Sequence, residues 1–303
     1  MSSQPQRSGT GRGIVYGLAA YGLWGMAPLY WPLLAPASAF EILAHRMTWS
    51  LIFLAILNVV RSRWDEIAVV LRDRRSMKLL SAAAVLITIN WGLYIWSVVN
   101  DHVIDAAFGY FLNPLVNVAF GVLVFREQLR RLQWVAVGIA ASGVLFLTID
   151  AGTLPWIGLI LGTTFSAYGM VKKKANVDAV ESMTIETILL LPFSASYLIW
   201  LFFQGNLALG QHGGWHTLWT LMAGVVTAVP LLAFGAAAVR VPYSTMGILQ
   251  YGSPTIQFLI GLLVYNEAMS TGRWTGFIIV WMALVVFTID AIRAGRNFAT
   301  SEE

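Results

Sequence analysis

The chain has 303 residues, of which 58% are hydrophobic and only 11% are charged, whereas an average soluble domain has about 25% charged residues. Each helical crossing of a bilayer needs roughly 20 apolar residues, so about ten crossings fit and no length remains for a soluble domain. The absence of cysteine excludes disulfides, thiolate metal sites and cysteine nucleophiles. The net charge of +4 lies mostly in short polar segments, which indicates an orientation signal rather than a nucleic-acid surface.

Ten continuous apolar runs predict ten transmembrane helices, because a membrane β-barrel would show shorter segments of alternating polarity. The first run is too long for the apolar region of a cleaved signal peptide, so it is expected to be retained. An amphipathic stretch, residues 64–71, is expected to form a helix on the membrane surface. The predicted spans are Gly13–Trp31, Ala37–Val60, Met77–Val99, Asp105–Phe125, Leu132–Ile149, Pro155–Val171, Val180–Phe203, Trp215–Val239, Pro242–Tyr265 and Trp274–Ile292.

The positions of lysine and arginine predict the orientation of these spans. With a cytoplasmic N-terminus, 17 of the 19 basic residues lie on the cytoplasmic side. The exceptions are Arg273, in an outward loop, and Arg46, inside the second span. The positive-inside rule therefore predicts that both termini are cytoplasmic.

An internal repeat with a spacing of 140 residues divides the chain into two copies of a five-helix unit. Because five is odd, the two copies cross the bilayer in opposite directions and are related by a pseudo-two-fold axis in the membrane plane. The predicted organisation is a tail (1–12), a first repeat (13–150), an inverted second repeat (151–292) and a second tail (293–303). The matched pairs include Glu41 and Glu181, Pro114 and Pro254, Gly121 and Gly261, Glu127 and Glu267, and Trp134 and Trp274.

The second span contains three ionisable residues, Glu41, His45 and Arg46. A charge at the bilayer centre costs at least roughly 2.5 kcal/mol, so these groups must face protein or water. They are candidates for substrate binding or ion coupling, and the alternative is a buried ion pair that fixes helix packing. Glu186 lies 140 positions after Arg46, which suggests the hypothesis of an Arg46–Glu186 ion pair at the midplane.

Polar and aromatic side chains near prolines form a second candidate group. Pro28, Pro114, Pro230 and Pro254 are predicted to interrupt helical hydrogen bonding beside a substrate cavity, although they could also be simple kinks among packing aromatics. Trp31, in contrast, is expected in the interfacial aromatic belt. The candidate substrate-binding residues are Trp24, Glu41, His45, Arg46, Asn90, Trp91, Tyr94, Tyr110, Asn113, Asn117, Glu186, Gln250, Tyr251 and Gln257.

Several of these residues belong to short motifs that together are similar to one family. The motifs are Trp24-Gly-Met-Ala-Pro28, Glu41-Ile-Leu-Ala-His45-Arg46, Gly109-Tyr-Phe-Leu-Asn-Pro-Leu-Val-Asn117 and Gln250-Tyr251 followed by Pro254-Thr255. They resemble the RarD group of the drug/metabolite transporter superfamily, over nearly the whole chain. The resemblance implies an all-α fold of two EamA-like repeats and a permease of the cytoplasmic (inner) cell membrane. Such permeases are often labelled by chloramphenicol sensitivity or resistance, and other relatives export amino acids and metabolites.

The expected function is therefore secondary transport of small organic metabolites or drugs by alternating access. A channel or sensory protein, and less so an intramembrane enzyme, are the alternatives; the sequence contains neither a Gly-rich filter nor a His-Glu-x-x-His motif. The expected partners are a small-molecule substrate and the lipid bilayer, with no nucleic acid, no cofactor and no metal. The chain is expected to act as a monomer or weak homo-oligomer, and proton coupling and facilitated diffusion both stay open.

Overall fold

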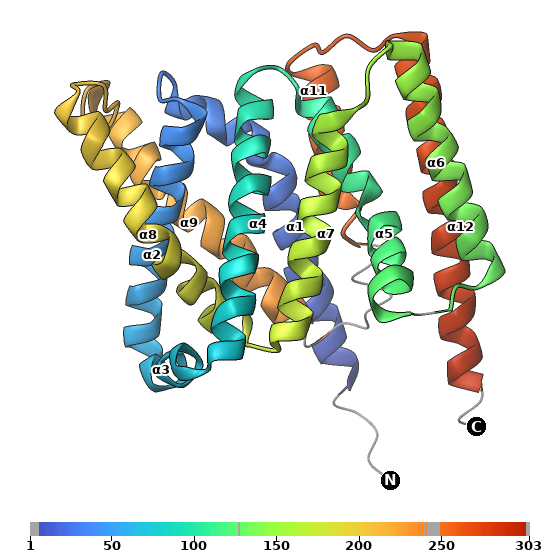
Figure 1. Cartoon of the computed structure of the whole chain (residues 1–303), viewed down its shortest axis with the longest axis horizontal. Coiled ribbons are helices and arrows are strands. Elements are labelled where there is room, and N and C mark those ends of the chain that lie inside the picture. Colours follow the sequence, from blue (N-terminus) through green and yellow to red (C-terminus); the bar gives the residue numbers. More distant parts are fainter. Residues whose placement is uncertain (1–5, 127, 239, 241–248, 301–303) are drawn as a thin grey trace.

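A computed structural model describes residues 6–126, 128–238, 240 and 249–300, and within them the chain forms helices joined by short loops, with no strand (Figure 1). The all-helical prediction is therefore confirmed. The elements are α1 (Gln6–Tyr30), the 3-10 helix η1 (Trp31–Leu34), α2 (Ala39–Arg61), α3 (Trp64–Arg72), α4 (Arg74–Val99), α5 (Val103–Phe125), α6 (Arg131–Ala151), α7 (Trp156–Ala175), α8 (Ala179–Phe203), α9 (Gly213–Ala238), α11 (Gly252–Leu263) and α12 (Thr271–Thr300).

Within this described part, seven helices are long and apolar enough to cross a membrane: α2, α4, α5, α6, α8, α9 and α12. The chain is thus a multi-pass membrane protein. Three lysines at the end of α7 lower its mean hydropathy, and α11 has only 12 residues. The predicted ninth span begins at Pro242 and the predicted eighth span ends at Val239. Both of these residues lie outside the described part of the chain. Ten crossings therefore stay a prediction.

The long helices run alternately up and down, and both ends of the described chain lie at one face of the bundle (Figure 1). We call this the terminal face and the opposite one the far face. The far face carries η1, the α4–α5 connection (residues 100–102) and the α11–α12 loop (residues 264–270). α3 lies at the terminal face, where its amphipathic pattern had predicted a short surface helix.

The helix bounds and contacts keep the spacing of the sequence repeat. α1 packs against α9 and α11, while α7, its counterpart in the second half, packs against α4 and α5. α6 and α12 pack against each other. Three pairs of helices start 139 or 140 residues apart: α2 and α8 at Ala39 and Ala179, α4 and α9 at Arg74 and Gly213, and α6 and α12 at Arg131 and Thr271.

Glycines allow the closest of these helix contacts. A Cβ atom on Gly109 of α5 would lie 2.6 Å from the carbonyl oxygen of Gly158 on α7. A Cβ atom on Gly224 of α9 would collide with the backbone of Trp49 on α2. Since small residues let the backbones of membrane helices approach closely, these glycines set the distance between α5 and α7 and between α2 and α9.

Candidate functional site

Arg46 is a buried cation in the first half of α2, and its side chain lies between two tryptophans. Only 6% of its surface is exposed. Its guanidinium carbon lies 3.7 Å from the ring centre of Trp91 on α4 and 5.1 Å from that of Trp31 in η1. Among the described residues no carboxylate reaches ion-pair distance of Arg46, and its Nε has no hydrogen-bond partner. Cation–π contacts therefore replace the usual counter-ion.

Three tyrosines complete the surroundings of this guanidinium. Tyr30, Tyr94 and Tyr110 all lie close enough to interact with it electrostatically. The rings of Tyr94 and Tyr110 are 5.7 Å apart, edge to face, and the Tyr30 ring is 5.0 Å from that of Trp31. We call the resulting enclosure the Arg46 cage; it consists of Tyr30, Trp31, Trp91, Tyr94 and Tyr110.

Asn90 orients one wall of the cage. Its Oδ1 accepts a hydrogen bond from the Tyr110 hydroxyl at 3.2 Å. Its Nδ2 donates to the carbonyl oxygen of Leu161 and to Oγ1 of Thr164, both on α7 and both at 2.9 Å. Asn90 is fully buried, so these bonds fix the tyrosine relative to α4 and α7.

Glu41 and His45 face a different neighbour from Arg46. Glu41 Oε1 accepts a hydrogen bond of 2.7 Å from the backbone N–H of Ala208, in the loop between α8 and α9. His45 Nε2 lies 3.6 Å from the same oxygen. Neither ring nitrogen of His45 has a hydrogen-bond partner among the described residues. The three ionisable groups of the second span therefore have different surroundings. Glu41 binds the α8–α9 loop and lies beside His45, whereas Arg46 lies in the cage.

Glu186 of α8 is neutralised by its own half of the chain. Lys172 Nζ, near the end of α7, donates to Glu186 Oε1 at 2.8 Å, and the Tyr168 hydroxyl donates to Oε2 at 3.0 Å. The hypothesis of an Arg46–Glu186 ion pair is wrong in this structure. The physical reason is that Lys172 and Tyr168 of α7 already satisfy the carboxylate, while the Arg46 guanidinium stacks on tryptophan rings.

Three of the four prolines that were predicted to interrupt helical hydrogen bonding lie inside helices that continue past them. Pro28, Pro114 and Pro230 lie inside α1, α5 and α9. Proline leaves the carbonyl four residues earlier without its helical partner. For Pro28 this carbonyl belongs to Trp24, and it accepts a hydrogen bond of 3.1 Å from Gln257 on α11. A side chain from another helix thus compensates for the missing bond.

The other predicted residues lie apart from the cage or bear on it only indirectly. Pro254 lies in the first turn of α11, and Gln250 and Tyr251 directly precede this helix. Asn113 is buried on α5, where its backbone carbonyl accepts from Ser166, and Asn117 is exposed. In the described part of the chain, no three His, Asp or Glu side chains gather as a metal site would require.

Two cage members were not among the predicted site residues. Trp31 was predicted in the interfacial belt, but it is only 2% exposed and faces Arg46, so that prediction is wrong. Tyr30 precedes it and is also buried. The available signal was the Trp31-Pro32 pair, because a proline directly after the helical run changes the backbone direction there.

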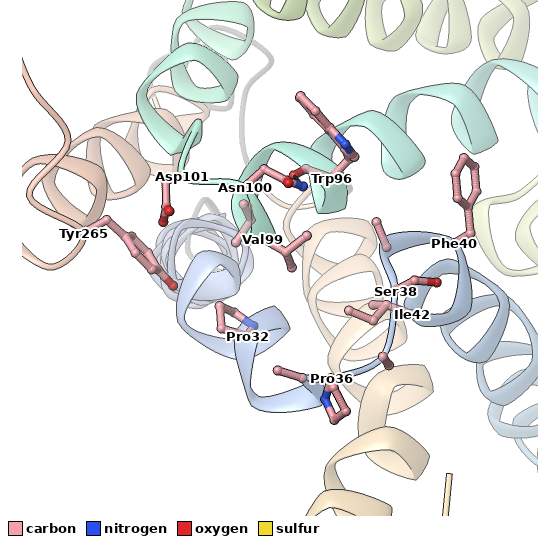
Figure 2. A pocket seen from close by; sticks show the side chains of 14 residues that line it. Pro32, Pro36, Ser38, Phe40, Ile42, Trp96, Val99, Asn100, Asp101 and Tyr265 are labelled. Atoms are coloured by element: carbon pink, nitrogen blue, oxygen red, sulfur yellow. Dashed lines mark hydrogen bonds between the residues drawn. The ribbon is translucent and has the colours of Figure 1, made fainter. Parts of the chain in front are cut away.

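A pocket of about 490 Å³ lies at the far face (Figure 2). Its rim includes the exposed residues Pro36, Asn100 and Asp101. Ile42 and Val98 also line it and are 0% and 1% exposed, so they form its inner wall. The pocket is bounded by η1 and the segment that follows it, the start of α2, the end of α4, and Tyr265.

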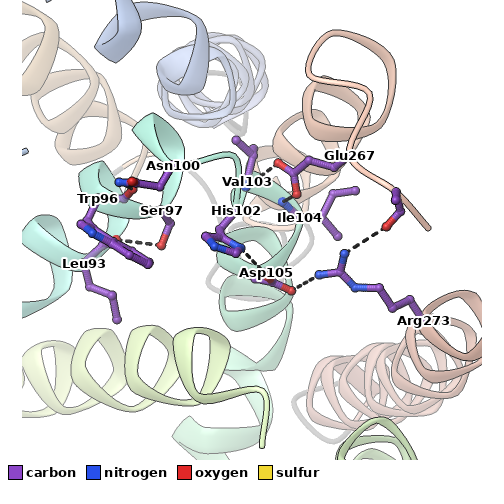
Figure 3. Close-up of polar contacts among 11 residues, drawn as sticks. Leu93, Trp96, Ser97, Asn100, His102, Val103, Ile104, Asp105, Glu267 and Arg273 are labelled. Atoms are coloured by element: carbon purple, nitrogen blue, oxygen red, sulfur yellow. Dashed lines mark hydrogen bonds and ion pairs between the residues drawn. The ribbon is translucent and has the colours of Figure 1, made fainter. Parts of the chain in front are cut away.

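A polar network beside this pocket joins α5 to the α11–α12 loop and to α12 (Figure 3). Glu267 accepts hydrogen bonds from the backbone N–H groups of Val103 at 2.6 Å and Ile104 at 3.0 Å. Asp105 forms an ion pair with Arg273, and its Oδ2 lies 3.2 Å from Nδ1 of His102. Burial raises the pKa of the Glu267 carboxyl, and the two backbone N–H groups offset part of this rise. The far face is therefore held by contacts between residues from the two halves of the sequence.

Comparison with known proteins places this architecture in a family. Residues 11–149 match the EamA-like transporter family. A RarD protein from Streptomyces exfoliatus is 50% identical, over 94% of this chain and 90% of its own length. An uncharacterized transporter from Vibrio cholerae is 40% identical over 98% of each chain. A crystal structure with 18% identity matches with a TM-score of 0.57, over 95% of this chain and 99% of that one, which shows a shared fold alone. The chain belongs to the RarD group of EamA-like permeases and is a membrane transporter.

Proposed function

We propose that this transporter moves small organic metabolites or drugs across the cytoplasmic membrane by alternating access between two inverted repeats. The observation that carries the proposal is the Arg46 cage, a buried polar and aromatic site inside a membrane bundle. It is formed by α1, η1, α2, α4 and α5. Aromatic walls with a few polar groups suit small organic molecules.

The spacing of the helices supports the inverted repeat. Helices that correspond at a spacing of about 140 residues make corresponding contacts, as in the packing of α1 on α9 and of α7 on α4. Two similar halves can form two openings of similar energy, one to each side of the membrane. The distribution of basic residues supports cytoplasmic termini, which would direct the far face away from the cytoplasm.

In this proposal, the contacts described above keep the far face of the transporter closed. Opening that face would separate α5 from the α11–α12 loop and break the Glu267 and Arg273 contacts (Figure 3). The substrate would then reach the bundle interior from the far side. Closure of the far face and opening of the terminal face would complete the cycle.

Flux through purified protein tests the proposal. Proteoliposomes loaded with a cellular metabolite extract should release a subset of compounds faster than protein-free liposomes, with a rate that saturates as the load rises. Saturation separates a carrier from a channel. Release that is independent of the protein, or that rises linearly without limit, would contradict transport by alternating access.

Cross-linking tests the movement itself, and the natural absence of cysteine makes the chain suited to it. Cysteines at Asp105 and Arg273, joined by a short bifunctional thiol reagent, should stop flux. The matched control joins cysteines at Asp65 and Val69, two exposed positions one turn apart on the short helix α3, and should leave flux unchanged. Full flux through protein cross-linked at the far face would show that this face does not open.

A further inference from the structure

Arg46 differs from the other buried or half-buried cations of the described chain because no carboxylate among the described residues balances its charge. Arg63, Lys172 and Arg273 each pair with a carboxylate, although all three are more exposed than Arg46. A buried charge without a partner is strongly unfavourable. Two cation–π contacts offset only part of this cost, so the site has an unmet requirement for an anion.

The geometry of the cage indicates which kind of anion fits. Trp91 covers a face of the guanidinium at 3.7 Å, and a stacked aromatic ring leaves the N–H groups at the guanidinium edge available. A guanidinium presents its five N–H donors in one plane, which matches the two oxygens of a carboxylate. Among the described residues that enclose it, Arg46 is the single cation, so one negative charge balances it, whereas a doubly charged phosphate would need a further cation.

The far-face pocket lies one helical turn from the cage. Ile42 lines the pocket, and Arg46 is four residues later on the same face of α2. Val98 lines it too, and Tyr94 is four residues earlier on the same face of α4. Four residues of helix span about 6 Å. A volume of about 490 Å³ is in the range of sites for small organic ligands, and about one helical turn of α2 and of α4 separates this pocket from the cage.

We infer that Arg46, stacked on Trp91 and Trp31, is the binding subsite for the carboxylate of an organic acid or zwitterion that enters through the far-face pocket. This inference rests on the proposed transport function and narrows its substrate class. The aromatic side chains of the cage hold the apolar body next to the carboxylate. Asn90 acts as a positioning residue, because it orients Tyr110.

Ligand binding to the purified full-length protein in lipid nanodiscs tests this assignment. The probes are benzoate, its neutral counterpart benzamide, and inorganic phosphate. Benzoate should bind with a dissociation constant below about 1 mM and roughly tenfold or more tighter than benzamide, since a hydrogen-bonded charge pair contributes about 1.5–3 kcal/mol. Benzoate that binds no tighter than benzamide, or phosphate that binds tighter than benzoate, would overturn the inference.

Two substitutions on the same helix assign the effect to Arg46. Arg46→Gln should bring the affinity for benzoate down to that for benzamide. Arg61→Gln is the matched control, because Arg61 is an exposed residue at the end of α2, and it should bind benzoate as the wild type does. Undiminished benzoate binding by Arg46→Gln would show that the buried guanidinium only supports packing.

A charge-conserving variant covers the case in which Arg46→Gln does not fold. Arg46→Lys keeps the positive charge but loses the planar pair of donors, so its preference for benzoate over benzamide should fall severalfold without vanishing. A wild-type preference for benzoate in Arg46→Lys would contradict recognition by the guanidinium. Because binding and flux are measured separately, flux of neutral compounds without benzoate binding would reject this inference alone, while benzoate binding without flux would reject transport alone.

Discussion

Arg46 and Glu186 occupy equivalent places in two corresponding helices, yet their surroundings are opposite. Each lies seven residues after the first residue of its helix, and they are 6% and 2% exposed. Glu186 is paired with Lys172 and Tyr168, whereas Arg46 is stacked on aromatic rings and pairs with no carboxylate among the described residues. A buried charge that the protein itself neutralises stabilises the fold, while one that it leaves unbalanced is available for a ligand. Two positions 140 residues apart thus hold buried charges that are balanced in different ways.

The largest expected effect is a difference in stability between Glu186→Leu and Arg46→Leu. Glu186→Leu should lower the free energy of unfolding by about 3 kcal/mol, because it leaves the Lys172 ammonium without its carboxylate. Arg46→Leu should change it by less than about 1 kcal/mol, since the lost cation–π contacts are offset by removal of an unbalanced buried charge. Unfolding by denaturant in detergent micelles measures both, and an equal loss in the two variants would contradict the comparison.

A double-mutant cycle sharpens the same contrast. Replacing both Lys172 and Glu186 by leucine should recover about 2 kcal/mol of the loss seen in Glu186→Leu, because a buried ion pair can be exchanged for apolar side chains at little cost. The corresponding cycle on Arg46 and Glu186 should give a coupling energy within about 0.5 kcal/mol of zero. A large coupling there would restore the ion pair that the sequence had suggested.

Glu41→Gln tests whether the contact of α2 with the α8–α9 loop is independent of ligand binding at Arg46. It should lower the free energy of unfolding by about 1–2 kcal/mol, because the Ala208 N–H loses its charged acceptor. Binding of benzoate at Arg46 should stay unchanged. Asp65→Asn, an exposed change on α3, is the control and should have no measurable effect on unfolding. Loss of benzoate binding in Glu41→Gln would show that the two ends of this cluster act together.

The smallest expected effect concerns the pH dependence of the far face. Burial raises the pKa of Glu267, so the folded protein favours the neutral carboxyl. The stability that the neutral Glu267 carboxyl contributes is therefore fully present below the pKa that this group has in the unfolded chain. It is lost as the pH rises through the higher pKa of the same group in the folded protein. The stability advantage of the wild type over Glu267→Gln should shrink as the pH rises above the ordinary pKa of a glutamate side chain, about 4, measured by thermal unfolding at each pH. A growing advantage would show that the backbone N–H groups outweigh burial.

The helices were largely predictable, because long apolar runs and charged ends determine them locally. The seventh predicted span, Val180–Phe203, corresponds to α8, which runs over Ala179–Phe203. The sequence also singled out Arg46, Trp91, Tyr94 and Tyr110 as polar or aromatic residues inside spans, and the structure brings them together. The local sequence pattern does not predict which other helix each helix face contacts.

Two particular residues show this limit. Trp31 was predicted in the interfacial belt from its place at the end of a span, whereas its burial depends on η1 and on the position of Arg46 in α2. Lys172 was counted only as a topology signal, yet it neutralises a carboxylate 14 residues away. Both errors concern contacts between different helices, which periodicity along one helix does not describe.

The first helix of each half of the chain, α1 or α7, packs against helices of the other half. This arrangement limits how the chain could be cut into two separately expressed fragments. α1 packs against α9 and α11, and Gln257 and Tyr265 bind the carbonyl oxygens of Trp24 and Pro28. α7 in turn packs against α4 and α5. A gene split at the junction of the two halves would thus yield two fragments, each lacking the helix that packs against it from the other half. Neither would be a self-sufficient folding unit, and activity would return only when both are made in the same cell.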